Sequence, residues 1–490
     1  MSFGTFPEAL ENNAIDKEIR SRVALESKDA VWTYRQLAHS AGAIVNALAE
    51  AGAPRKSRVG LLAERNIYSI AALLGIMTGG HTVCPIDARL SAPDIRRRFR
   101  SAGIRWIIAD SANEAKARQL GCVQVLNLKE SLDSGFSPFY AVGPEDEALM
   151  LFTSGSTGAP KAVLLTHGNL MANALGVAER TGVTPDDRLL HAMPIFHTNG
   201  INNQLIVPLL CGAKVALLEK FRAETFFDEM QAWRPTYVTG VPTMFSRLLP
   251  FTPPKNAISE LRFVRCGAAP LSEQLHKLVE EHLGVPLVLS YGLSEATCTS
   301  AMNPPAARKY GTVGTALSNQ SISIRDPSNG KMLGPDEEGE ICIAGPAVMK
   351  TYVPEQGPEV FYEGHCLRSG DIGKLDADGY LSITGRLKDV IIRGGENISP
   401  GSIESVLSLH HSIKECVVMG QADQDLGEVP VAFVVLKEDQ RFEESALKNE
   451  IEEKLSRIHV PKYIFEVSSF PVNSIGKIDR KALKTQVRSK

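Results

Sequence analysis

The sequence predicts an α/β protein that has a large N-terminal domain of layered α/β sheets, a β-rich subdomain, and a small α+β domain at its C-terminal end. Three observations lead to this prediction. Near-continuous apolar runs alternate with helical patterns from residue 57 to residue 292. Short strands with many turn residues follow in 322–345, and the chain then ends with helix, strand, strand and helix. Alternating strand and helix patterns are typical of layered, largely parallel sheets.

The first sheet-forming segments are apolar runs that show little polar alternation. Such runs are expected where a strand is covered by other elements on both faces. The segments interpreted as strands are 57–63, 105–110, 148–153, 213–219, 236–241, 261–267 and 286–292. The helices predicted among them are 67–80, 223–234 and 272–284. This order predicts parallel sheets with helices in the connections.

A domain boundary is predicted at 385–400, where the sequence reads GRLKDVIIRGGENISP. This segment combines a short apolar strand with two glycines, an asparagine and a final proline, a pattern typical of special backbone geometry. The elements predicted beyond it are helices at 401–410 and 444–458 and strands at 415–420 and 429–436. We therefore predict an N-terminal domain over 1–385 and a C-terminal domain over 386–490.

The bulk composition indicates an ordinary globular protein. Hydrophobic residues make up 43% of the 490 residues and the net charge is −3, so charge gives no reason to expect nucleic acid or an anionic membrane as a partner. The eight cysteines show no C-x-x-C spacing, which argues against a zinc site or a redox dithiol. The N-terminus lacks an apolar signal region, and no apolar run reaches the roughly 18 residues of a spanning helix. We expect a cytoplasmic protein.

The stretch 151–163, LFTSGSTGAPKAV, is rich in glycine and hydroxyl side chains and follows an apolar run. Glycines let backbone N–H groups approach an anion closely, while hydroxyls and a lysine add further donors. The residues concerned are Thr153, Ser154, Gly155, Ser156, Thr157, Gly158 and Lys161. The Walker pattern fails because Pro160 stands five positions after Gly155, where that pattern requires glycine. The stretch is interpreted as a polyphosphate-binding loop, and a flexible Ser/Gly connector remains the alternative.

Three further motifs carry candidate ligand groups. In SYGLSE (290–295), which follows an apolar strand, Tyr291 is a candidate to stack on a base and Glu295 a candidate ligand of Mg²⁺. Asp371 in RSGDIG is a candidate acceptor for ribose hydroxyls, and Lys477 in SIGKIDR follows a glycine near the chain end. Each also fits a simpler role: a solvated carboxylate for Glu295, an Asx-turn residue for Asp371, and a surface lysine for Lys477.

Six motifs occur in the order and approximate spacing of the adenylate-forming superfamily, which the chain resembles from residue 20 to residue 484. They are FTSGSTGAPKAV, PIFHTNG, SYGLSE, RSGDIG, GRLKDVIIRGGENISP and SIGKIDR. The superfamily contains acyl-CoA synthetases, adenylation domains and beetle luciferases. The resemblance implies a β-barrel-like subdomain within the large domain and a hinge to a mobile C-terminal domain that carries a catalytic lysine. It also implies that a carboxylate attacks the α-phosphate of Mg-ATP, that pyrophosphate leaves, and that a thiol then displaces AMP.

The resemblance also implies roles for individual residues. Lys477, His197 and Glu295 are implied to be catalytic: Lys477 bridges the carboxylate and the α-phosphate, and His197 forms a gate beside the acyl pocket. Glu295 and Thr153 are the implied Mg²⁺ ligands. Lys388 matches the hinge position. The residues implied to bind the nucleotide are Thr153, Ser154, Gly155, Ser156, Thr157, Gly158, Lys161, Gly267, Ala268, Ser290, Tyr291, Gly292, Ser294, Asp371, Arg386 and Lys388.

The segment PIFHTNGINNQ lacks the aspartate that usually receives the amino group in domains activating α-amino acids, and it resembles acyl-CoA synthetases. We therefore predict an AMP-forming ligase that uses ATP, Mg²⁺ and CoA to activate a small or medium carboxylic acid. A stand-alone adenylation enzyme that loads the phosphopantetheine arm of an acyl carrier protein is the alternative. A non-catalytic nucleotide-binding protein is a third hypothesis, which the intact lysine and glutamate motifs disfavour.

The roles of two further positions are left open by the sequence. Arg265, after a predicted strand, is interpreted either as a contact for a second substrate carboxylate or as half of an ion pair within the scaffold. Ile392 stands where several members of the superfamily carry a lysine that assists thioester formation. Arg393, the next residue, is a candidate to substitute for that lysine in part.

Overall fold

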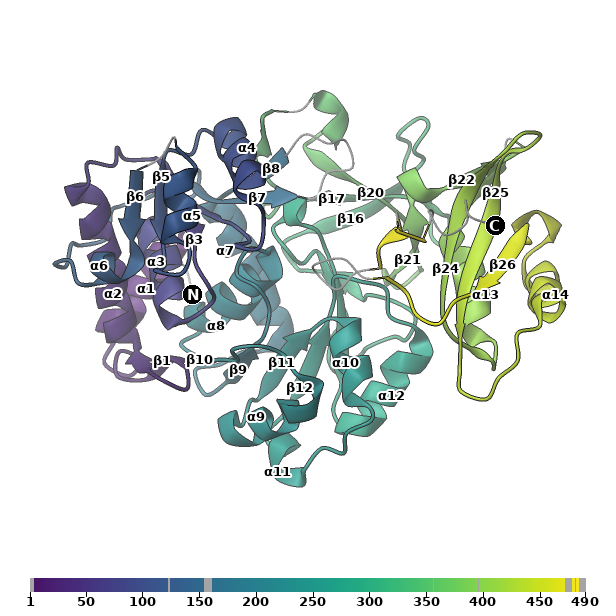
Figure 1. The fold of residues 1–490 in the computed structure, drawn as a ribbon, viewed down its shortest axis with the longest axis horizontal. Coiled ribbons are helices and arrows are strands. Elements are labelled where there is room, and N and C mark those ends of the chain that lie inside the picture. The colour runs from purple at the N-terminus through teal and green to yellow at the C-terminus, as the bar shows by residue number, and fades with distance from the viewer. Residues whose placement is uncertain are drawn as a thin grey trace.

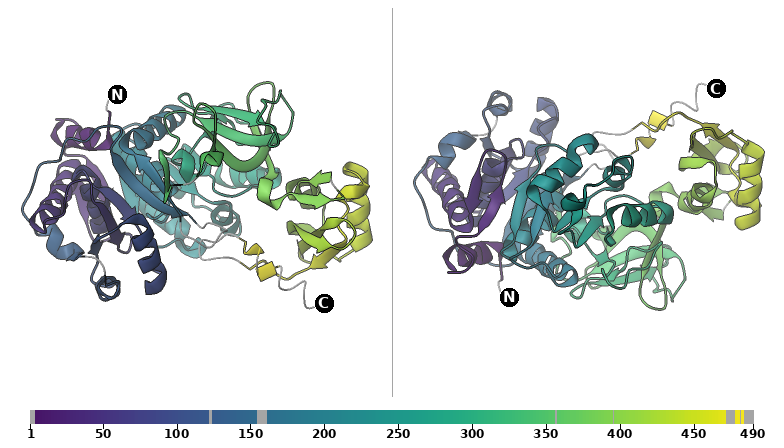
Figure 2. Two further views of the ribbon diagram at one scale, coloured as in Figure 1. Left: turned by 90° about the horizontal axis from the view of Figure 1, so that it is seen from above. Right: turned by 90° about the horizontal axis from the view of Figure 1, so that it is seen from below.

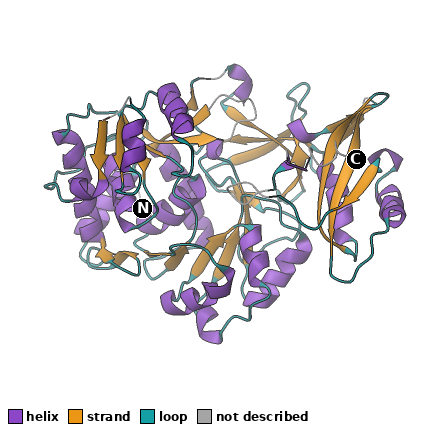
Figure 3. Cartoon of the chain, viewed as in Figure 1, coloured by secondary structure: helices purple, strands orange, loops and turns teal. Residues whose placement is uncertain are grey.

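The computed structural model describes residues 4–121, 124–153, 161–355, 357–394, 396–471, 478–480 and 482–483. Two large sheets and one smaller sheet form the body of the chain, and a fourth sheet with its own helices stands at one end (Figure 1). The views from above and below show the same separation of the C-terminal part (Figure 2). Helices lie against the two large sheets, whereas the smaller sheet is mainly strands and loops (Figure 3).

The seven-stranded sheet has the order β18-β8-β7-β4-β3-β5-β6. Its strands are β3 (Arg58–Leu62), β4 (Thr82–Pro85), β5 (Trp106–Ala109), β6 (Gln124–Asn127), β7 (Glu147–Thr153), β8 (Lys161–Thr166) and β18 (Thr351–Val353). Strands β3 to β7 pair in parallel, as predicted, whereas β8 and β18 are antiparallel. The prediction of parallel sheets is wrong at this edge, because the seven residues between β7 and β8 are too few for a crossover helix.

The nine-stranded sheet has the order β15-β14-β13-β12-β11-β9-β10-β1-β2. Its strands are β1 (Val23–Glu26), β2 (Val31–Thr33), β9 (Arg188–His191), β10 (Lys214–Leu217), β11 (Tyr237–Gly240), β12 (Phe263–Cys266), β13 (Leu287–Tyr291), β14 (Ala301–Met302) and β15 (Thr315–Ala316). The central strands are parallel, and β2, β14 and β15 are antiparallel. The carboxyl ends of β12 and β13 therefore lie side by side.

The helices of the body are stabilised by caps and by burial. They are α1 (Phe6–Ile15), α2 (Tyr34–Glu50), α3 (Ile67–Thr78), α4 (Ala92–Ala102), α5 (Glu114–Gln119), α6 (Leu128–Leu132), α7 (His167–Thr181), α8 (Val207–Leu210), α9 (Phe226–Trp233), α10 (Pro242–Leu248), α11 (Lys255–Ile258) and α12 (Glu273–Leu283), with a π-helix, η1, at Asn199–Ile206. Thr33 and Gln36 form a capping box at the start of α2. Helix α3 is apolar and almost completely buried, as a helix packed between layers must be. Within the described ranges, no helix is long and apolar enough to cross a membrane.

The smaller sheet of the body is antiparallel and forms the β-rich subdomain. Its strands are β16 (Ser321–Arg325), β17 (Gly339–Ala344), β19 (Phe361–Tyr362), β20 (Cys366–Leu375) and β21 (Leu381–Arg386). The order is β16-β17-β20-β19, and β21 also pairs with β20. This last pairing places Asp371 directly opposite Arg386, which brings two predicted site residues together.

The C-terminal part has its own sheet, with the order β23-β22-β25-β24 and β26 beside β25. Its elements are β22 (Ile391–Arg393), β23 (Glu396–Ile398), α13 (Pro400–Leu409), β24 (Ile413–Asp423), β25 (Gly427–Leu436), α14 (Glu444–Lys454) and β26 (Tyr463–Glu466). A short 3-10 helix, η5 (Leu387–Asp389), joins it to β21. Layered sheets with a small C-terminal α+β domain confirm the predicted fold class.

Direct contacts across η5 hold the two parts in their observed orientation. The Ser399 hydroxyl donates a hydrogen bond to the carbonyl oxygen of Thr384 at 2.5 Å. On the first turn of α13, a Cβ atom at Gly401 would lie 2.1 Å from the same carbonyl oxygen. The orientation therefore depends on glycine at position 401.

Candidate active site

The predicted phosphate-binding loop begins and ends at residues that pair with each other. Thr153, the last residue of β7, lies opposite Lys161, the first residue of β8. The structure thus fixes both ends of the loop at the carboxyl end of β7. Five residues of the prediction lie outside the described residues: Ser154, Gly155, Ser156, Thr157 and Gly158.

A chain of contacts joins the end of this loop to the motif at 290–295. The Lys161 Nζ lies over the ring of Tyr352, 5.7 Å from its centre. The Tyr352 hydroxyl in turn donates to Glu295 Oε1 at 2.7 Å, and burial is the main cause that raises the pKa of Tyr352 above its usual range. The structure therefore brings Lys161 and Glu295 to one locality. Tyr352 was missed because nothing in its own segment indicates that β18 pairs with β8.

A second group of contacts surrounds Asp371. Its Oδ2 accepts a hydrogen bond from the Tyr291 hydroxyl at 2.8 Å, and its Oδ1 lies 2.9 Å from Arg386 Nε. Burial raises the pKa of Tyr291 well above its usual range, so the phenol stays protonated and acts as the donor. The structure thus gathers three predicted nucleotide-binding residues from β13, β20 and β21. Tyr291 is 8% exposed, and its stacking on a base stays a prediction.

Further predicted nucleotide residues lie at or just after the ends of β12 and β13. A Cβ atom at Gly267 would lie 2.9 Å from Ser290 Oγ, so these two residues are in close contact. Ala268 follows with a positive φ of 68°. This left-handed conformation is uncommon for a residue other than glycine and turns the chain away from the strand direction. Ser294 begins a short 3-10 helix, η3 (Ser294–Ala296), that packs against β8.

Packing alone requires glycine at position 292, and its contact with a nucleotide stays a prediction. A Cβ atom there would lie 1.9 Å from the carbonyl oxygen of Cys298. We expect Gly292→Ala to lower the free energy of unfolding by about 3 kcal/mol, at the upper end of overpacking costs, and to lower activity with it. Urea unfolding measures the effect. Gly135→Ala is the control, because a Cβ atom at Gly135 makes only an ordinary contact at 3.6 Å; equal stability of the two variants would refute the packing argument.

His197 lies two residues before the start of η1, in a segment that contacts residues following β4. Its ring is 4.8 Å from that of Phe196, and the guanidinium of Arg89 lies 5.6 Å from the centre of the Phe196 ring. Arg89 also pairs with Asp87 at 2.8 Å. Arg89 is the main cause that holds the pKa of Asp87 below its usual value, and His197 contributes to that shift. The structure places His197 among aromatic and charged groups, which suits a gate.

A buried polar cluster that contains Arg265 lies beside η1. Its Nε donates to Ser290 Oγ at 3.2 Å, and its terminal nitrogen donates to Thr299 Oγ1. Asn203, on η1, contacts the same threonine hydroxyl and Cys298 Sγ. Of the two interpretations of Arg265, the scaffold ion pair is not observed within the described residues. Asn203 and Thr299 were missed because their shared contact depends on how η1 packs.

The C-terminal candidates are only partly described. Lys388 is exposed on η5, whereas Lys477 lies outside the described residues. Ile392 is 54% exposed. Arg393 donates to the carbonyl oxygens of Ile458 and Val460, so it is engaged in its own domain. Its part in thioester formation stays a prediction.

The donors at the site suit Mg²⁺ and a nucleotide. Magnesium prefers carboxylate, hydroxyl and phosphate oxygens, and Glu295 and Thr153 supply the first two. Within the described part of the chain, no group of three or more His, Cys, Asp or Glu side chains is arranged so that it could hold a metal ion. A site of this kind would use substrate phosphates as its remaining ligands.

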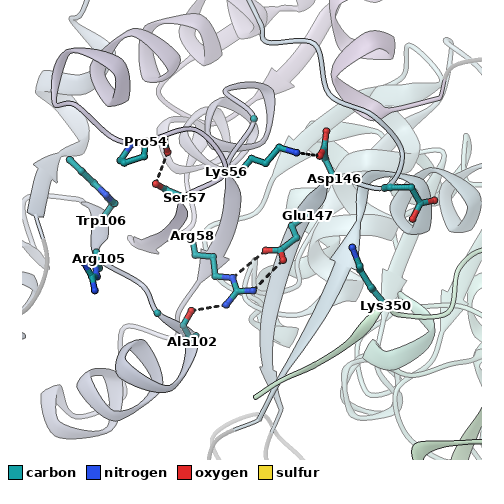
Figure 4. Close-up of a pocket in the computed structure, with 13 residues that line it drawn as sticks. Pro54, Lys56, Ser57, Arg58, Ala102, Arg105, Trp106, Asp146, Glu147 and Lys350 are labelled. Atoms are coloured by element: carbon teal, nitrogen blue, oxygen red, sulfur yellow. Dashed lines mark hydrogen bonds and ion pairs between the residues drawn. The ribbon is translucent and has the colours of Figure 1, made fainter. Parts of the chain in front are cut away.

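A cavity of about 500 Å³ lies at the amino ends of β3, β4, β5 and β7 (Figure 4). Among the charged side chains that line it, Lys56 pairs with Asp146 at 2.7 Å and Arg58 pairs with Glu147 at 3.2 Å. The predicted site residues stand at the opposite, carboxyl end of β7. We therefore assign this cavity no part in the chemistry.

Two family models match the chain. The model described as "AMP-binding enzyme" matches residues 11–353, and the model described as "AMP-binding enzyme C-terminal domain" matches residues 402–477. The sulfoacetate–CoA ligase of Cupriavidus necator is 32% identical over 467 residues, which cover 91% of each chain. A feruloyl-CoA synthase of an Amycolatopsis species is also 32% identical, over 464 residues and 93% of each chain.

Among solved structures, ATP-bound MatB from Rhodopseudomonas palustris superposes with a TM-score of 0.92. It is 28% identical, and the match covers 98% of this chain and 99% of that one. The apo structure of the same protein gives a TM-score of 0.84 over the same coverage. The chain as a whole thus superposes better on the ATP-bound structure than on the apo structure.

Proposed function

Because the chain belongs to the AMP-binding enzyme family, we propose that it is an AMP-forming acyl-CoA ligase acting on a small carboxylic acid. The observation that supports this proposal best is the grouping of Tyr291, Asp371 and Arg386 at one end of β13 and of Lys161 and Glu295 nearby. The similar CoA ligases among the relatives favour CoA over a carrier protein as the thiol acceptor.

The first half-reaction follows from the charges at this site. The acid's carboxylate oxygen attacks the α-phosphorus of ATP, the bond to the bridging oxygen breaks, and pyrophosphate leaves with the electron pair. Lys161 offers a cation to the departing phosphates, and Asp371 accepts hydrogen bonds from the ribose. A bound Mg²⁺, held by Glu295 and Thr153, would neutralise phosphate charge. Lys477 would stabilise charge between the carboxylate and the α-phosphate.

The second half-reaction requires a thiol to reach the acyl carbon. The thiolate adds to the carbonyl of the acyl-adenylate, and AMP leaves with the C–O bonding pair. AMP is a far better leaving group than hydroxide, so two easier steps replace one difficult step. We propose that the part beyond η5 rotates between the steps about Lys388, and that 1–385 and 386–490 are the two moving bodies.

A pyrophosphate-exchange screen over carboxylic acids, repeated with and without CoA, tests the function. We expect exchange with at least one small acid, and CoA-dependent release of AMP with the same acid. If AMP release ignores CoA but requires a phosphopantetheinylated carrier protein, the carrier-loading alternative replaces the proposal. If no acid supports exchange, the chain is a nucleotide-binding protein without this activity.

The contact of α13 with β21 gives a test of the rotation. We expect Gly401→Ala to slow acyl-adenylate formation about 10²-fold, the size of effect that a displacement of about 1 Å produces, because its Cβ atom would lie 2.1 Å from the Thr384 carbonyl oxygen. Thioester formation from supplied acyl-adenylate should be spared. Rapid-quench assays measure the rate of each step separately. Ser405→Ala, a change on the same helix, is the control and should leave both rates unchanged. Equal slowing of both steps would count against rotation.

A further inference from the structure

Arg265 is a buried cation without a carboxylate partner. It is 4% exposed, and its contacts within the described residues are the neutral hydroxyls of Ser290 and Thr299. The residues that the structure does not describe contain no aspartate and no glutamate, so they offer no side-chain carboxylate either. Buried charges in proteins are normally paired, so the absence of a side-chain carboxylate at Arg265 calls for an explanation.

The side chains around Arg265 do not supply the missing negative charge. Burial raises the pKa of the Cys298 thiol above its usual value, so Cys298 stays neutral. Burial lowers the pKa of Arg265 only to about 10, so the guanidinium stays charged at neutral pH. On β11, Thr239 lies directly opposite Arg265, and its buried hydroxyl has no hydrogen-bond partner in the structure. A guanidinium without a counter-charge and a hydroxyl without a hydrogen-bond partner thus stand on neighbouring strands.

The position of this cluster indicates which ligand would bring a negative charge to Arg265. Arg265 precedes the end of β12 and contacts Ser290, which directly precedes Tyr291. Thr299, the other partner of Arg265, contacts Asn203 of η1, the element that follows His197. The cluster therefore connects the nucleotide side with the gate residue. A different cation, Lys161, is the proposed contact for the phosphates, and it lies over Tyr352.

We propose that Arg265 binds a second anionic group, a carboxylate or a sulfonate, on the acid that is activated, and that Thr239 adds a hydrogen bond to it. This inference rests on the proposed function and narrows its substrate class to short acids that carry two negative charges. The two curated relatives do not decide the matter, because sulfoacetate carries a second anionic group and ferulate does not.

The test compares matched acids in the pyrophosphate-exchange assay with the full-length protein. The pairs are malonate with malonamate, succinate with succinamate, and sulfoacetate with acetate. We expect the native protein to prefer the dianionic member of at least one pair by about 10²-fold in kcat/KM, because a buried ionic contact contributes on this scale. In Arg265→Gln this preference should fall to within about threefold, whereas Arg247→Gln, a change at an exposed arginine of α10, should retain it.

A second measurement keeps the inference testable if activity is low. The preferred dianion should raise the unfolding temperature of the native protein and leave that of Arg265→Met unchanged, because a ligand stabilises only the state that binds it. If Arg265 merely supports Ser290 and Thr299, its variants should lose stability and keep the native ratio between paired acids. That result would overturn the inference, and so would a preference of the native protein for monoanionic acids. Neither result would contradict the proposed ligase activity. Exchange with no acid would instead overturn the proposed function.

Discussion

Lys477→Ala is expected to slow acyl-adenylate formation about 10²–10³-fold, the loss typical of removing one well-placed donor from a developing charge. The thioester step should proceed at its native rate when acyl-adenylate is supplied, because the proposed role of this lysine ends once pyrophosphate has left. Single-turnover assays with radiolabelled ATP and with synthetic acyl-adenylate measure the two steps separately.

The matched control is Lys414→Ala, which removes an exposed lysine from β24 of the same C-terminal part. It should leave both steps unchanged. Equal loss of both steps in Lys477→Ala would show that this lysine has been assigned the wrong role. Full adenylation activity in the variant would remove it from the mechanism altogether.

Asp371→Asn is expected to raise the KM for ATP about 10²-fold, because a hydrogen bond to a charged group contributes about 1.5–3 kcal/mol. The carboxylate now accepts from Tyr291 on one oxygen and faces Arg386 on the other. An amide has only one acceptor oxygen, so it cannot keep these contacts and also receive ribose hydroxyls. Initial-rate kinetics at varied ATP, with saturating acid, measure the change.

The control for this variant is Asp378→Asn, an exposed aspartate in the turn between β20 and β21. Its KM for ATP should stay within about twofold of the native value, as is usual for surface changes. A 2′-deoxy analogue of ATP gives a second check, since Asp371→Asn should discriminate against it less than the native protein does. An unchanged KM for ATP in Asp371→Asn would place the ribose elsewhere.

The sequence predicted those candidate site residues best that lie near the end of a predicted strand. Segments 286–292 and 148–153 were identified by their apolar pattern, and described residues near their ends (Tyr291, Glu295 and Lys161) take part in groupings of contacts. Two of those groupings, around Asp371 and around Glu295, are contacts between distant segments. Only the resemblance to a known superfamily, and not the local pattern, related these segments to one another.

What the sequence did not predict depends on packing between layers. Tyr352 joins Lys161 to Glu295 only because β18 pairs with β8. Neither strand was among those predicted, and their antiparallel edge departs from the parallel sheets that were expected in general, since periodicity reports burial and not strand direction. For Arg265 both interpretations were reasonable from sequence alone, because an ion pair depends on where carboxylates lie in three dimensions.

The pairing of Asp371 with Arg386 bears on the timing of product release. Arg386 is the last residue of β21, and η5 begins at the next residue. If Asp371 binds the ribose as proposed, Arg386 would have to share that carboxylate, and nucleotide binding would be felt at the residue where the connection to the C-terminal part starts. We expect the departure of AMP to restore the full ion pair, which would act as a reset signal between successive turnovers.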